Sequence, residues 1–152
     1  MPPPSARTTK LAAQVWRRIF DFIIATSPRR IELLALYGLT PNDSRALQTP
    51  GLDGKGRTMR SLAAEWRCDA STATWTVDRL EAKGLAERRA HATDRRVKLV
   101  ALTPHGIATK AALIAGIYAP PPELLELPDQ ELIELERAVS VLPALNEEDQ
   151  GS

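Results

Sequence analysis

The sequence predicts a mainly α-helical (α+β) fold, and three observations support that prediction. Apolar residues recur at helical spacing over most of the 152 residues. Between Leu85 and Leu102 two short runs of alternating character break this period and indicate two strands joined by a polar loop. Proline follows serine or threonine at several expected helix starts, such as Thr40-Pro41 and Thr103-Pro104. The length suits one domain with its own core.

The N-terminal third is predicted to contain a tail and three helices. Residues 1–9 are rich in proline and polar side chains and are expected to be disordered. Helical periodicity runs from Lys10 to about Thr26, and Ser27-Pro28 is predicted to start a second helix that ends at Gly38. A short third helix is expected to begin at Thr40-Pro41. Residues 49–57, with three glycines and a proline, are predicted to form a loop.

Two helices are predicted next, and the second carries the pattern of a DNA-reading helix. Thr58 is expected to cap the first, and Asp69 is the expected N-cap of the second. In that second helix Ala73, Val77 and Leu80 form one apolar stripe, and Gly84 is expected to end it. Its opposite face carries hydroxyl, basic and aromatic side chains, which a helix needs to read the major groove: Ser71, Thr72, Trp75, Asp78 and Arg79. A merely solvated face is the alternative.

A basic hairpin follows this helix. The predicted strands cover residues 85–89 and 96–102, with the polar loop AHATD between them. Only Glu87 and Asp94 offset the five cations of the hairpin: Arg88, Arg89, Arg95, Arg96 and Lys98. A helix-turn-helix followed by a basic two-stranded ribbon is a winged helix-turn-helix.

The C-terminal part is predicted to consist of two helices that mediate dimerisation. The first begins at Thr103-Pro104 and runs to about Tyr118, where the sequence APPPE stops it. The last begins at Pro128 and repeats apolar residues at helical spacing: Leu132, Leu135, Val139 and Leu142. One small winged domain cannot cover both this stripe and the apolar first helix. A homodimer is therefore expected.

Three motifs in the central region resemble the MarR family of bacterial transcriptional regulators. They are DRLEAKGLAERR (Asp78–Arg89), DRR (Asp94–Arg96) and LTPHG (Leu102–Gly106), in the family's order and spacing. The resemblance implies a protein that binds double-stranded DNA at a pseudo-palindromic operator, most often as a repressor. It also implies a single domain over residues 10–146, with a DNA-binding part at about 40–102, dimerisation helices at about 10–38 and 104–143, and an acidic tail at 147–152.

The resemblance also assigns the DNA contacts. Arg95 and Arg96 are the wing arginines, expected at the minor groove or its phosphates. Asp78 and Asp94 are the expected wing-orienting residues, with Asp78 paired to Arg96. The positions that match the DNA-reading segment are Ser71, Thr72, Thr74, Trp75 and Arg79, whereas phosphate contact or simple solvation is expected for Lys83, Arg88 and Arg89. Trp75 either touches thymine methyls or sugars, or packs inward.

Members of the family commonly bind small aromatic ligands between the dimerisation and DNA-binding parts. Four residues are candidates for such a ligand crevice: Trp16, Phe20, Ile23 and Tyr37. Plain core packing is the equal alternative for all four. The resemblance thus makes a small aromatic effector a candidate partner of this chain.

Composition narrows the remaining function classes. The net charge is +1, but the charges are unevenly distributed, with nine acidic residues and one arginine from Glu123 onward. The rest of the chain is therefore basic and suited to bind a polyanion. The alternative is an acidic C-terminal helix that serves only solubility. Cys68 is the single cysteine, so an intramolecular disulfide is excluded and the sequence fits a reducing cytoplasm. The Cys68 side chain is expected to be small, apolar and buried.

Targeting, metal and catalytic signals are lacking in the sequence. The chain start has no apolar signal segment, and no run is long enough to span a bilayer. His91 and His105 are isolated, and no catalytic or phosphate-binding motif occurs. Neither a cofactor nor enzymatic activity is expected. The competing class is a winged-helix protein-interaction module without significant DNA affinity.

Overall fold

The protein is a mainly α-helical winged helix-turn-helix with one small antiparallel sheet, as a computed structural model of residues 3–143 describes it. The helices are α1 (Ala6–Leu36), α2 (Pro41–Leu47), α3 (Met59–Trp66), α4 (Ala70–Ala82), α5 (Pro104–Ile117), α6 (Pro122–Leu125) and α7 (Asp129–Val139). The strands are β1 (Arg57–Thr58), β2 (Ala86–Ala90) and β3 (Lys98–Leu102). The acidic tail predicted at 147–152 lies outside the described residues.

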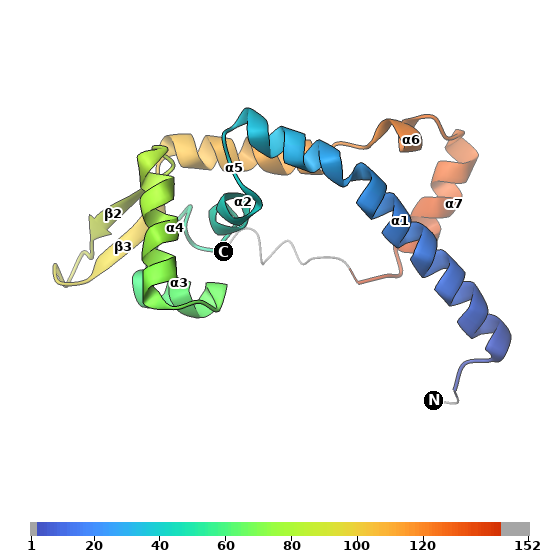
Figure 1. Cartoon of the computed structure of the whole chain (residues 1–152), viewed down its shortest axis with the longest axis horizontal. Helices are drawn as coiled ribbons and strands as arrows, with labels where there is room; N and C mark the ends of the chain where they lie inside the picture. The colour runs from blue at the N-terminus through green and yellow to red at the C-terminus, as the bar shows by residue number, and fades with distance from the viewer. Residues whose placement is uncertain (1–2, 144–152) are drawn as a thin grey trace.

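The elements are spread along one long axis. The strands lie at one end with α3 and α4, and α7 lies at the other end beside the N-terminal half of α1 (Figure 1). Helices α1 and α5 pack on each other between the two ends. No helix of residues 3–143 is both long and apolar enough to cross a membrane. In the same residues no cluster of three or more His, Cys, Asp or Glu side chains is placed to hold a metal ion.

The first helix is continuous, where the sequence predicted a tail and two helices. Ser5 caps it by accepting a hydrogen bond from the Thr8 amide at 3.1 Å, so the helix already begins at Ala6 within the segment expected to be disordered. Pro28 lies inside this helix and has no N–H for the Ile24 carbonyl. The Ser27 hydroxyl donates to that carbonyl instead, at 2.8 Å. This local replacement explains why the predicted break at Ser27 is wrong.

The helix caps that the sequence predicted are confirmed. Thr40, Thr58, Asp69 and Thr103 each accept a hydrogen bond from the backbone amide three residues further on. Gly84 ends α4 with φ at 69°, in the left-handed region that favours glycine.

The sheet has three strands in the order β1-β3-β2, and β1 was missed because its residues were assigned to the loop 49–57 and the following cap. Strand β1 pairs Arg57 with Val100 and Thr58 with Leu99. A strand of two residues is too short to show an alternating pattern.

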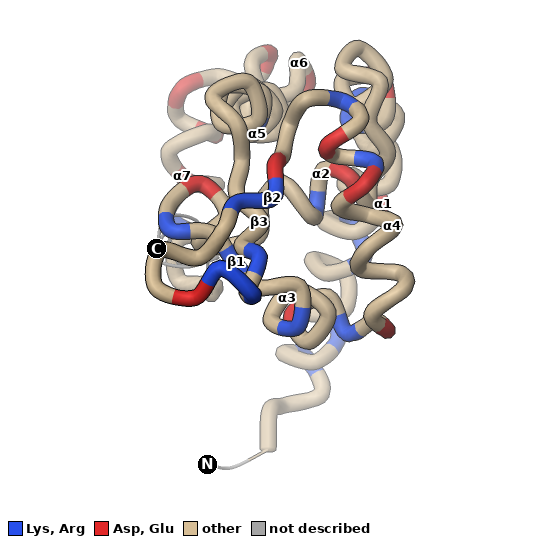
Figure 2. The backbone as a smooth tube through the Cα atoms, turned by 90° about the vertical axis from the view of Figure 1, so that its left-hand side faces the viewer, with Lys and Arg blue, Asp and Glu red and all other residues tan. Residues whose placement is uncertain are grey.

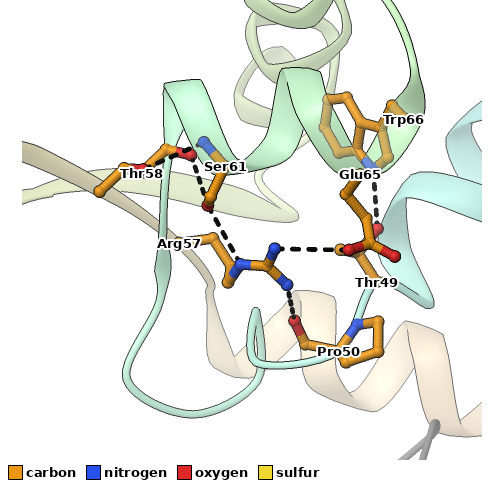
Figure 3. A network of polar contacts seen from close by, with 7 residues as sticks. All are labelled: Thr49, Pro50, Arg57, Thr58, Ser61, Glu65 and Trp66. Carbon is orange, nitrogen blue, oxygen red and sulfur yellow. Dashed lines mark hydrogen bonds and ion pairs between the residues drawn. The ribbon is translucent and has the colours of Figure 1, made fainter.

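Arg57 holds β1 and the preceding loop in place (Figure 3). Its guanidinium donates to the carbonyl oxygen of Pro50 at 2.9 Å and to the Ser61 hydroxyl at 3.1 Å. Nearby, the indole N–H of Trp66 donates to the Thr49 hydroxyl at 2.8 Å. The network ties the loop after α2 to α3, the first helix of the helix-turn-helix.

The core lies between α4, the sheet and α5, and it fixes which face of α4 is turned outward. The apolar stripe predicted on α4 is fully buried, at 0% exposure for Ala73, Val77 and Leu80. These side chains share the interior with leucines and valines of the other elements: Leu34, Leu47, Leu62, Val100, Leu102 and Leu113.

Candidate nucleic-acid interface

The outward face of α4 is presented to solvent as the sequence predicted. Ser71, Thr72, Thr74 and Trp75 are all exposed, on the side of the helix away from the buried stripe. At the start of α4 the Asp69 carboxylate accepts from the Ser71 hydroxyl and from the Thr72 amide, each at 2.7 Å. These bonds lower the pKa of Asp69 below its ordinary value, and the bond from the Ser71 hydroxyl has the largest effect. The first turn is therefore held in a fixed geometry.

Arg79 is only partly exposed, because two of its nitrogens are bonded to α2. Its Nε and Nη2 donate to the two carboxylate oxygens of Asp43 on α2, at 3.2 and 2.8 Å. Its guanidinium carbon lies 4.7 Å from the ring centroid of Trp75. Asp43 is buried, and a buried carboxylate is strongly destabilising once its cation is removed. Arg79 therefore serves the α2–α4 contact in this structure.

The Asp43 ion pair predicts a dependence of stability on pH. Burial by itself raises the pKa of Asp43, but the hydrogen bonds from Arg79 and Thr40 outweigh it and hold the pKa below the ordinary 3.8. A lowered folded-state pKa gives stability that is present above about pH 5 and is lost as pH falls through 4 and below.

Thermal unfolding between pH 2 and about pH 6 measures this effect. The unmodified protein should lose more stability on acidification than Asp43→Asn, in which the carboxylate is absent at every pH. Glu126→Gln, at the exposed end of α6, should behave like the unmodified protein. Equal acid-induced losses in all three proteins would contradict the assignment.

The wing is anchored to α4 by Arg88, not by Arg96. The Arg88 guanidinium bonds Asp78 at 2.7 Å and also pairs with Glu81, whose other carboxylate oxygen accepts from the Arg88 amide at 2.9 Å. The predicted Asp78–Arg96 pair is therefore wrong. The reason is topological: β2 runs beside α4, whereas Arg96 lies beyond the wing tip on the way to β3. The Arg88 guanidinium, considered for a phosphate contact, is thus bonded to two carboxylates of α4.

Arg95 and Arg96, the expected wing arginines, are both exposed at the wing tip. Asp94 accepts from the Arg96 amide at 3.0 Å and so shapes the turn, but neither guanidinium is hydrogen-bonded or ion-paired within residues 3–143. Figure 2 shows Lys and Arg along the strands at this end of the molecule. The other two predicted phosphate contacts already have partners: Arg89 bonds Glu87 at 2.6 Å, and Lys83 bonds the Gly38 carbonyl at 2.6 Å.

Helix α2 adds a cation that the sequence analysis missed. Arg45 is exposed and, with Asn42, borders a hollow of about 220 Å³ whose other wall includes Thr72 and Trp75 of α4. Nothing in the sequence marked Arg45, because its closeness to α4 arises only from the packing of α2. Cys68 lines the same hollow and is half-buried, so the expected burial of its thiol is only partial.

The predicted ligand crevice is not formed by its four candidate residues. Trp16 and Tyr37 lie about 30 Å apart, because 21 residues of nearly continuous helix separate them. Trp16, Phe20, Ile23 and Tyr37 are all exposed, so the core alternative is wrong as well. A different hollow of about 560 Å³ lies between α1, α2, α3 and α5, and Arg30 and Arg45 contribute cations to its lining.

Fold and site together define a winged helix-turn-helix protein with a basic wing. Residues 37–97 match the sequence profile of the MarR family. No curated protein matches the chain. The winged helix-turn-helix segment of this chain is therefore similar to the MarR family, and the chain as a whole has the fold of solved proteins of that family.

Three solved structures illustrate the likeness. The YusO protein from Bacillus subtilis is 24% identical, with a TM-score of 0.71 over 91% of this chain and 97% of that one. The multiple antibiotic-resistance repressor (MarR) from Listeria monocytogenes is 18% identical, with a TM-score of 0.73 over 87% and 92%. MepR of S. aureus, in complex with DNA, is 22% identical, with a TM-score of 0.61 over 83% and 99%.

Proposed function

We propose that this chain is a sequence-specific, double-stranded-DNA-binding transcriptional regulator that acts as a dimeric repressor in the cytoplasm. One observation carries the proposal: the outward face of α4 stands beside a wing whose tip bears two exposed arginines that have no hydrogen-bond or ion-pair partner among residues 3–143. The major groove, about 12 Å wide, admits such a helix, and a narrow minor groove attracts arginine. The DNA complex of S. aureus MepR shows that a protein of this fold binds DNA.

Dimerisation is proposed through α7 and the N-terminal half of α1, at the end of the molecule opposite the wing (Figure 1). Both expose large apolar side chains, and between them lies a hollow of about 810 Å³. Among the exposed residues are Trp16, Phe20, Ile24, Leu135, Val139 and Leu142. A surface of this kind marks a protein contact, and a second copy brings the same stripe to meet it.

The expected result is a homodimer at micromolar concentration in sedimentation experiments. Val139→Asp combined with Leu142→Asp should shift it toward monomer, because the introduced carboxylates would be buried at the contact. Arg137→Asp, on the opposite side of α7, is the matched control and should stay dimeric. A monomeric unmodified protein would contradict the proposal.

Selection from random DNA duplexes tests the function itself. The expected product is a sequence with two-fold symmetry, whose half-sites lie about 10 base pairs apart. Gel-shift titration of the enriched duplex should then give tighter binding than a random duplex of equal length. If no sequence is enriched and no duplex is shifted, the protein-interaction alternative takes precedence.

The hollow between α1, α2, α3 and α5 supports a second role, binding of a small effector. Its volume falls in the range of ligand sites, and Trp66 and Tyr118 line it together with Arg30 and Arg45. We propose an aromatic ligand with an anionic group, complementary to the two arginines, that weakens operator binding. Ethidium, the aromatic cation in a MepR structure, illustrates only that a protein of this fold takes up an aromatic compound. A panel of aromatic carboxylates that changes operator affinity in the unmodified protein, but not in Arg30→Ala, would support this role. A panel without effect would exclude it.

A further inference from the structure

We propose that Trp75 reads a thymine methyl group in the major groove, and that Arg79 positions Trp75 instead of reading a base. This inference rests on the proposed DNA-binding function and names the residue that gives it sequence preference. The central observation is the stack of the Arg79 guanidinium on the Trp75 ring, at 4.7 Å.

Trp75 occupies the centre of the outward face of α4. It lies two residues from Ala73 and two from Val77, both fully buried, so at about 100° per residue it points to nearly the opposite side. Trp75 is 57% exposed, and its neighbours Ser71, Thr72 and Thr74 all carry hydroxyl groups. A large aromatic side chain exposed within a polar recognition face is typical of a binding contact.

The indole is held in place by a chain of contacts that begins on α2. The Thr40 amide donates to Asp43 Oδ2 at 2.9 Å, and both Asp43 oxygens accept from Arg79. Arg79 then lies over the Trp75 ring, where its cation is attracted to the face of the indole. A side chain held this way loses little rotamer freedom when it binds, so its contact contributes more fully to affinity.

The chemistry of the two side chains decides which base is read. Thymine alone presents a methyl group in the major groove. The indole has a large apolar surface and one N–H donor but no acceptor, so the amino groups of adenine and cytosine have nothing to donate to. The Nε and Nη2 atoms of Arg79 are already bonded to the buried carboxylate of Asp43, and its guanidinium lies over the Trp75 ring, so these contacts hold the guanidinium against the protein. The geometry therefore assigns base recognition to the apolar indole of Trp75 and the positioning of that indole to the cation of Arg79.

Deoxyuridine substitution tests whether Trp75 contacts a thymine methyl group. In the duplex enriched by selection, each thymine is replaced in turn by deoxyuridine, which lacks only the methyl group. At one thymine per half-site the unmodified protein should lose about fourfold in affinity, as expected for one buried methyl group. Trp75→Ala should bind the two duplexes equally, and Trp75→Phe should keep part of the preference. Unchanged preference in Trp75→Ala, or no sensitive thymine at all, would overturn the proposal.

A second arm tests the positioning residue. Arg79→Lys keeps a cation for Asp43 but lacks the planar group that stacks on indole. It should reduce the preference for thymine over deoxyuridine, while its sensitivity to 7-deazaguanine stays that of the unmodified protein. Loss of 7-deazaguanine sensitivity in Arg79→Lys would show that Arg79 reads guanine, and would overturn this part. If the unmodified protein selects no sequence, the proposed function itself fails, and that outcome is visible before any base is modified.

Discussion

Gly106→Ala should destabilise the protein by about 3 kcal/mol, although alanine is the better helix former. Gly106 lies in the first turn of α5, where a Cβ atom would overlap the Leu85 carbonyl oxygen and approach the carbonyl carbon to 2.8 Å. Both obstacles are backbone atoms that cannot move aside alone. The Leu85 carbonyl also accepts from the Thr103 amide at 3.0 Å, so a shift there would disturb the base of the wing. Urea unfolding measures the loss.

Gly116→Ala is the matched control, because it places the same methyl group in the same helix. There a Cβ atom would meet only the flexible end of the Leu33 side chain, at 2.7 and 3.0 Å. The gain in helix propensity of about 0.5–1 kcal/mol should offset much of the adjustment. Equal destabilisation by the two substitutions would contradict the close approach of α5 to Leu85.

Removal of the wing arginines should weaken DNA binding and flatten its dependence on salt. Each phosphate contact that is lost should reduce the slope of log K against log salt by about 0.9, or roughly 2 per dimer for one arginine. Arg95→Ala and Arg96→Ala should therefore lose affinity for operator and unrelated DNA alike. Arg137→Ala removes the same charge from α7, far from the wing, and should leave the slope unchanged.

Arg96→Ala should leave the wing itself folded, since Asp78 bonds Arg88 and not Arg96. Arg88→Ala is the contrasting variant: it releases Asp78 and Glu81 on α4 and should loosen the wing. Unchanged affinity and unchanged slope in both Arg95→Ala and Arg96→Ala would mean that the wing does not contact DNA. The protein-interaction alternative would then gain weight.

The features that the sequence predicted correctly are those determined by residues close together in the chain. The buried stripe of α4 and the caps at Thr58 and Asp69 are set by residues three or four positions apart, so their patterns are visible in the sequence. The continuous helix α1 was missed because the usual effect of Pro28 is cancelled by one hydroxyl, that of Ser27.

The errors at the site come from distant partners. Asp43 and Arg79 are 36 positions apart, and no sequence pattern marks a buried carboxylate on a helix as short as α2. Arg88 and Arg96 are both cations near an acidic helix residue, and only the course of β2 beside α4 decides which of them bonds Asp78. Similarly, Trp16 lies within α1 and Tyr37 caps its C-terminus, and they share no crevice because the helix does not break between them.

Hydrogen exchange with and without the selected duplex tests the central claim, that α4 and the wing form the DNA-binding surface. The amides of Ala92–Arg96 lie in the exposed wing tip, outside regular strands, and should exchange fast in the free protein. Bound DNA should slow their exchange and that of the first turn of α4, and leave α7 unaffected. Protection confined to α7, or none at the wing tip while the duplex is bound, would contradict the account.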